Sequence, residues 1–106
     1  MENETQEKIN QLSQFEQSAH QFLSQRQMIQ TQILEIESAL KELKTTDNSY
    51  KIIGNIMVKT DKVVLDKELN SKKEMLEIRV KSIEKQEKII KEKASALQKE
   101  VMAKMD

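Results

Sequence analysis

The feature that most constrains this chain is the stretch Tyr50–Thr60 at its middle, which contains the only glycine in the sequence. Gly54 and Asn55 stand between two short runs rich in β-branched residues. Glycine at the first position of a two-residue turn supplies the positive φ of a type II′ hairpin. The stretch therefore predicts a strand, a tight turn and a second strand, with Ile53 paired to Ile56.

Both faces of this expected hairpin are apolar near its turn. Alternation along the strands puts Ile53, Ile56 and Val58 on one face and Tyr50, Ile52 and Met57 on the other. A lone two-stranded hairpin is marginal in water, and its open edges invite pairing with another chain. We therefore expect these six residues and Gly54 to form an oligomer interface. The alternative is that the hairpin folds back on the chain's own helices.

A heptad frame runs without a break from Leu12 to Leu43 and is typical of a coiled-coil seam. Nine of its ten a and d positions are apolar. Position a holds Leu12, Ala19, Arg26, Ile33 and Leu40, and position d holds Phe15, Phe22, Ile29, Ile36 and Leu43. The exception is Arg26, and one polar residue at an a position often sets the register.

A second, looser frame follows the hairpin, after a possible helix cap at Thr60 or Asp61. Its d positions are Leu69, Leu76, Ile83, Ile90 and Leu97, and its a positions are Lys73, Val80, Glu87, Ala94 and Val101. Several apolar residues fall outside this seam: Met75, Ile78, Ile89, Met102 and Met105. Either a neighbour packs on them or they are isolated exposures, which are common on protein surfaces.

These patterns predict a mainly α fold, a long antiparallel two-helix coiled coil with one central β-hairpin joining the helices. We expect a single domain over residues 1–106, with helices at about 5–44 and 61–104 and the hairpin at about 50–60. The antiparallel arrangement places Leu12 near Leu97 and brings the two termini together.

The sequence gives no indication of catalysis, a metal or a cofactor. It has no Cys, one His and one Gly, which leaves no zinc cluster and no glycine-rich phosphate loop. No apolar run is long enough for a membrane span or a signal peptide, so we expect a cytoplasmic protein. The net charge is zero, and residues 61–106 hold twelve basic and ten acidic groups, which does not suggest nucleic-acid binding.

The central hairpin between two equal helices resembles the prefoldin family, in particular the beta-type subunit of archaeal kind. The residues that carry this resemblance are Tyr50, Lys51, Gly54, Val58, Lys59, Thr60 and Leu69, together with the lysine- and glutamate-rich tract over 85–93. The resemblance covers nearly the whole chain, and the single hairpin indicates the beta type. Ile53 departs from the valine expected before the glycine, a conservative change.

The resemblance implies a hexamer of two alpha-type and four beta-type subunits whose hairpins form β-barrels. Its coiled coils would hold non-native client proteins and pass them to a group II chaperonin without ATP. Apolar and flexible residues near the fraying termini are the expected client-binding tip: Ile9, Leu12, Phe15, Leu97, Val101, Met102 and Met105. Two other classes stay open, a structural coiled-coil tether without chaperone activity and a nucleic-acid binder.

Overall fold

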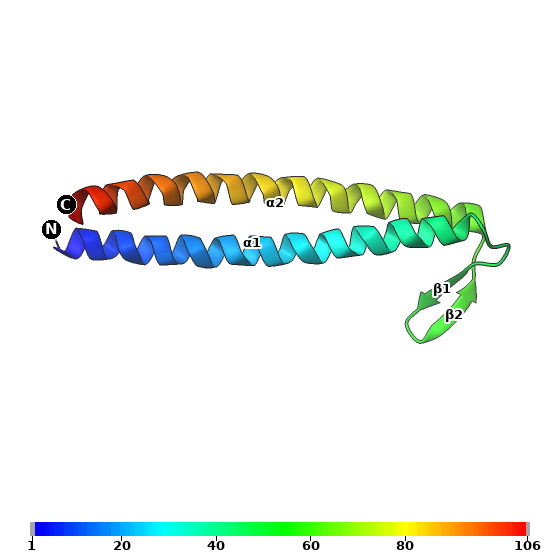
Figure 1. Cartoon of the computed structure of the whole chain (residues 1–106). Coiled ribbons are helices and arrows are strands. Elements are labelled where there is room, and N and C mark those ends of the chain that lie inside the picture. Colours follow the sequence, from blue (N-terminus) through cyan, green and yellow to red (C-terminus); the bar gives the residue numbers. More distant parts are fainter. Residues whose placement is uncertain (1, 106) are drawn as a thin grey trace. The chain divides into compact units, whose positions relative to one another are not determined.

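The computed structural model describes residues 2–105 and the side chains of residues 3–104. The elements follow one another as helix α1 (Glu2–Leu43), strand β1 (Tyr50–Ile53), strand β2 (Ile56–Lys59) and helix α2 (Lys62–Met105) (Figure 1). The expected fold class, two long helices joined by one hairpin, is confirmed. No helix within the described residues is long and apolar enough to cross a membrane.

The start of α2 is fixed by Asp61 rather than by Thr60. The carboxylate Oδ1 of Asp61 accepts a hydrogen bond from the backbone N–H of Val63 at 3.4 Å. Its backbone carbonyl accepts the helical bond from the N–H of Leu65 at 3.0 Å. Asp61 is therefore the N-cap, since its side chain satisfies a backbone donor in the first turn that has no partner inside the helix.

The hairpin has the register that its two-residue turn predicts. The strands are antiparallel, with Ile53 opposite Ile56 and Tyr50 opposite Lys59. Gly54 has a φ of +60°, and no non-glycine residue of the described chain has a positive φ. A type I′ turn would need positive φ at Asn55 as well, so the turn is type II′.

Two hydrogen bonds close the base of the hairpin. The backbone N–H of Thr60 donates to the carbonyl of Ser49 at 2.9 Å, and the Ser49 hydroxyl donates to the carbonyl of Thr60 at 2.5 Å. Ser49 is the buried polar residue of this region, with 7% of its surface exposed. Its hydroxyl has a partner, so its burial leaves no unsatisfied donor.

The chain divides into two compact units. One unit holds residues 1–27 and 81–106, and Ile83 and Val101 are buried in it. The other holds residues 28–80 and buries five seam residues: Ile29, Ile36, Leu43, Leu76 and Val80. Every one of these buried apolar residues occupies an a or d position, which confirms both predicted seams.

Within each unit, ion pairs between the helices fit the expected antiparallel alignment. In the first unit the Nζ of Lys8 lies 3.1 Å from a carboxylate oxygen of Glu100. In the second unit the Nζ of Lys73 lies 3.3 Å from a carboxylate oxygen of Glu37. The hydrogen bond to Glu100 raises the pKa of Lys8 above its ordinary value.

Candidate interaction surfaces

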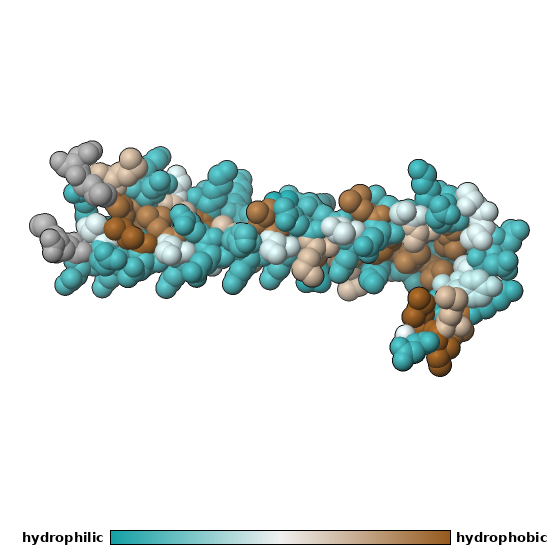
Figure 2. Space-filling view, turned by 60° about the horizontal axis from the view of Figure 1, so that its bottom comes forward, coloured by the Kyte–Doolittle hydropathy of each residue, from teal (hydrophilic) through white to brown (hydrophobic). Residues whose placement is uncertain are grey.

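The hairpin presents apolar side chains on both of its faces. Its six apolar residues are between 41% and 70% exposed: Tyr50, Ile52, Ile53, Ile56, Met57 and Val58. Figure 2 shows hydrophobic side chains, coloured brown, gathered on the visible face of the hairpin. The alternative that the hairpin folds back on its own helices is wrong, because packing of that kind would bury one of the two faces.

An ion pair connects the hairpin to helix α2. The Nζ of Lys51 in β1 lies 2.8 Å from a carboxylate oxygen of Glu68 in α2. Lys51 shares a hairpin face with Ile53, Ile56 and Val58, so this pair lies beside one of the two apolar faces. The heptad pattern does not indicate this contact, since Glu68 is outside the seam.

Two of the polar residues at a positions, Arg26 and Glu87, pair with each other inside the first unit. The Nε of Arg26 donates to one carboxylate oxygen of Glu87 at 2.6 Å, and Nη2 donates to the other at 3.3 Å. This two-point contact raises the pKa of Arg26 above its ordinary value. The sequence marks each residue as a break in its seam, but the pairing depends on how the two helices align.

The residues expected at the client-binding tip differ widely in exposure. Ile9 is 41% exposed and Met102 is 61% exposed, so both offer apolar surface to a partner. Three others are half-buried in the seam: Leu12, Phe15 and Leu97. Val101 is buried at 6% exposure and supports the coiled coil rather than a free surface. The side chain of Met105 lies outside the described residues. We call these seven residues the terminal cluster.

A hollow of about 480 Å³ opens in the seam next to Phe15. Ala19 and Ala94 line it, and both occupy a positions where a larger residue would fill the space between the helices. The hollow also has Phe15 and Ile90 in its lining, with Glu87 beside them. The prediction from sequence missed this hollow, although small residues at a positions of both helices were a visible signal for it.

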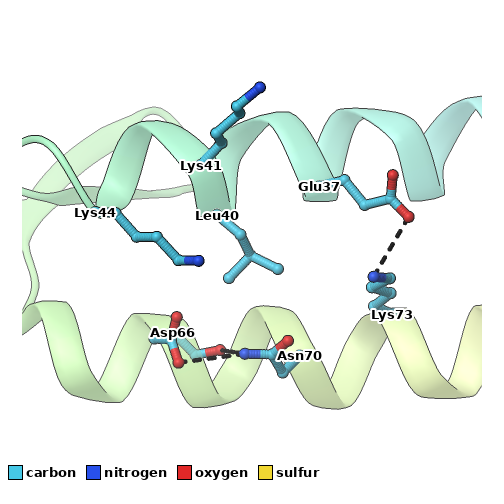
Figure 3. Close-up of a pocket in the computed structure, with 7 residues that line it drawn as sticks. All are labelled: Glu37, Leu40, Lys41, Lys44, Asp66, Asn70 and Lys73. Atoms are coloured by element: carbon cyan, nitrogen blue, oxygen red, sulfur yellow. Dashed lines mark hydrogen bonds and ion pairs between the residues drawn. The ribbon is translucent and has the colours of Figure 1, made fainter.

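A second hollow lies between α1 and α2 in the unit that carries the hairpin (Figure 3). It has a volume of about 530 Å³ and is lined mainly by charged and polar groups: Glu37, Leu40, Lys41, Lys44, Asp66, Asn70 and Lys73. Glu37 pairs with Lys73, and the Asn70 amide donates to Asp66 at 3.2 Å. Lys41 points away from α2 in Figure 3, so its charge does not converge with the others on one ligand.

The described residues contain no group of three or more His, Cys, Asp or Glu side chains that could hold a metal ion. The sequence has a single His, and His20 lies on the exposed side of α1 with neighbours of the same helix: Ser13, Glu16, Gln17 and Gln21. A general base needs a positioned substrate and an orienting partner, and an open helix surface provides neither. The surfaces described above are suited to binding.

These surfaces define a class of protein, namely coiled-coil subunits that carry an exposed apolar β-hairpin between two antiparallel helices. A family model described as "Prefoldin subunit" matches residues 6–106 of the chain. The chain belongs to the prefoldin subunit family, whose members are chaperone subunits and not enzymes.

Its relatives are named as beta subunits, which confirms the resemblance to the beta type. Prefoldin subunit beta of Sulfurisphaera tokodaii is 35% identical, over 92% of this chain and 81% of the relative. Prefoldin subunit beta of Methanospirillum hungatei is 36% identical, over 95% of this chain and 87% of the relative. The crystal structure of the prefoldin beta subunit from Thermococcus strain KS-1 matches with a TM-score of 0.87 and 31% identity, over 94% and 90% of the two chains.

Proposed function

We propose that this chain is a beta-type subunit of a cytoplasmic, hexameric chaperone that holds non-native polypeptides without ATP and passes them to a group II chaperonin. The observation that carries the proposal is a hairpin with exposed apolar side chains on both faces, in a chain of the prefoldin family. Burial of these six apolar side chains at an interface would stabilise an assembly by several kcal/mol. The isolated chain lacks this stabilisation, because the side chains are exposed in it. Assembly with an alpha-type subunit and further beta-type copies supplies the missing cover.

We place client binding at the exposed residues of the terminal cluster, Ile9 and Met102, and at the hollow next to Phe15, which we call the seam hollow. A non-native client presents apolar segments of no fixed shape, so adaptable contacts suit it better than a rigid pocket. Met102 is flexible and exposed, and the hollow beside Phe15 and Ala19 can accept an apolar side chain of moderate size. Several subunits that grip one client would raise its affinity through effective concentration.

The client-binding role can be tested by substitution at exposed positions. Deleting the chain ends would also remove buried Val101 and the Lys8–Glu100 pair, and burial of one valine is worth about 1.5–3 kcal/mol. The double variant Ile9→Gln and Met102→Gln avoids this cost, because both side chains are exposed. We expect it to assemble normally and to protect an aggregating client less well, as followed by light scattering.

The control changes two apolar residues outside the terminal cluster that are more exposed than Ile9 and Met102. Met28→Gln with Leu34→Gln removes side chains that are 64% and 65% exposed. Client protection should remain normal in this control. Equal protection by both double variants would show that the terminal cluster does not bind clients.

A tether without chaperone activity is the alternative, and the same assay distinguishes it. A tether would leave client aggregation unchanged at any ratio of the assembled complex to client. Transfer to a chaperonin is a separate step, measured by the refolding yield of a prefoldin-bound client after addition of chaperonin and ATP.

A further inference from the structure

The outer face of α2 carries a hollow that neither the hairpin surface nor the terminal cluster accounts for. It has a volume of about 570 Å³ and six lining residues: Lys88, Lys91, Glu92, Ser95, Ala96 and Lys99. Ser95 and Ala96 are small, so the longer side chains around them form walls over an apolar floor. Exposed Ile89 precedes Ala96 by about two helical turns, and exposed Met102 follows Ser95 by the same spacing.

The hollow has an excess of positive charge, because two nearby carboxylates of α2 are paired with basic residues of α1. Glu87 is held by Arg26, and Glu100 is held by Lys8, so both carboxylates are engaged with α1. The lining itself holds three lysines and one glutamate. The outer face of α2 is therefore basic around an apolar floor, although the whole chain has no net charge.

We propose that this outer hollow, lined by Lys88, Lys91, Lys99 and Ala96, binds acidic polypeptide segments that carry apolar side chains between their carboxylates. The apolar side chains would contact the floor at Ala96, and the carboxylates would pair with the lysines. The hollow shares Lys91 and Ser95 with the seam hollow, so one segment can contact both. This inference rests on the proposed chaperone function and names a class of segment that it would favour.

A nucleic acid is the less suitable occupant for the same basic face. Single-stranded nucleic acids bind through stacking on aromatic side chains as well as through charge. No Phe, Tyr or Trp occurs in the sequence after Tyr50, so α2 has no aromatic residue to stack on a base. An acidic peptide with leucines matches both the charge and the apolar floor.

The test measures the binding of fluorescent peptides to the full chain by anisotropy, alone and assembled with an alpha-type subunit. The probe is a helical peptide of glutamates and leucines. Three other probes are compared with it. In the first, lysines replace the glutamates; in the second, serines replace the leucines; the third is oligothymidylate. We expect the acidic, leucine-containing peptide to bind most tightly, and its affinity to fall when salt rises from about 0.05 to about 0.5 M.

Matched variants locate the site. The triple variant Lys88→Gln, Lys91→Gln and Lys99→Gln should bind the acidic peptide about eightfold more weakly, since each exposed ion pair is worth a factor of about two. The control Lys41→Gln, Lys67→Gln and Lys72→Gln removes the same charge elsewhere and should bind normally. Ala96→Glu should abolish binding by filling the floor with a carboxylate, whereas Ala103→Glu on the same helix should not.

Two outcomes would overturn the inference. One is equal affinity of the wild type and the Lys88, Lys91 and Lys99 variant for the acidic peptide. The other is equal or tighter binding of the lysine peptide, the serine peptide or oligothymidylate. Suppression of client aggregation is measured in parallel, so normal suppression by a chain that fails the peptide test would reject the outer hollow and leave the proposed function standing.

Discussion

At the scale of single residues, replacing Gly54 would destabilise the turn through backbone strain and not through a steric clash with neighbouring residues. A Cβ at this position would meet no heavy atom within 4 Å, but φ is +60°. A β-branched residue is strained in this conformation by roughly 1–3 kcal/mol. We expect Gly54→Val to abolish assembly with an alpha-type subunit while the helical circular dichroism signal persists.

The neighbouring turn residue gives the control for Gly54. Asn55 has no positive φ, so Asn55→Ala should assemble as the wild type does. Native mass spectrometry of each variant mixed with the partner subunit measures the outcome. Normal assembly of the Gly54→Val chain would mean that the type II′ turn is not needed for the interface.

The ion pair between Arg26 and Glu87 gives a second prediction at the residue scale. Removing one partner leaves a charge in the seam without its counter-ion, so Arg26→Leu alone should lower the melting temperature. The double variant Arg26→Leu and Glu87→Leu replaces the ion pair by an apolar layer and should melt above the wild type. A polar layer restricts alignment, so the double variant should also form additional oligomers.

Thermal unfolding followed by circular dichroism measures the melting temperature, and native mass spectrometry detects additional oligomers. A charge-matched control is Lys73→Leu with Glu37→Leu, a more exposed pair between the same helices. If the Arg26 and Glu87 double variant melts below the wild type, the pair contributes to stability and not only to alignment.

At the scale of the elements, the hairpin is the proposed base of the assembly. Ile56→Lys with Val58→Lys places two charges on one face of the hairpin, next to Lys51 of β1 on the same face. Burial of these charges would be unfavourable, so we expect soluble, helical and dissociated chains. The control Met28→Lys with Leu34→Lys adds equal charge on α1, and its assembly, measured by analytical ultracentrifugation, should match the wild type.

Local patterns predicted the elements well, because each depends on a few neighbouring residues. The single glycine between two β-branched runs determined the turn and the hairpin register. The a and d positions identified the buried residues of both helices. A heptad pattern nevertheless looks the same after a shift of seven residues, so it predicts which side of a helix is buried better than which residues meet across the seam.

Two of the features that the sequence did not predict depend on that alignment. Arg26 meets Glu87 only at one axial position of the helices, and the hollow between Ala19 and Ala94 arises from the same alignment. The Lys51–Glu68 pair depends on how the hairpin is oriented relative to the first turns of α2. Such contacts depend on three-dimensional geometry that residue types and spacing do not determine.

At the scale of the whole molecule, the chain alone buries its helical seams but not its hairpin. Its seams bury apolar residues within each unit, whereas the six apolar side chains of its hairpin stay 41% to 70% exposed. Both outer edges of the two-stranded sheet also lack a neighbouring strand within the described residues. Open edges and apolar faces together favour pairing with strands of other subunits.

Hydrogen exchange followed by mass spectrometry tests this difference between the chain alone and the assembled complex. Backbone amides over 50–59 should exchange fast in the isolated chain, because a lone hairpin opens readily. Addition of an alpha-type subunit should slow their exchange by at least about tenfold, since strands in a completed sheet open rarely. Seam amides around Ile36 and Leu76 should be slow in both states and serve as the internal reference. Fast exchange over 50–59 in a complex whose mass shows full assembly would place the interface outside the hairpin, and the exposed helical residues Val63, Met75 and Ile78 would then be examined in its place.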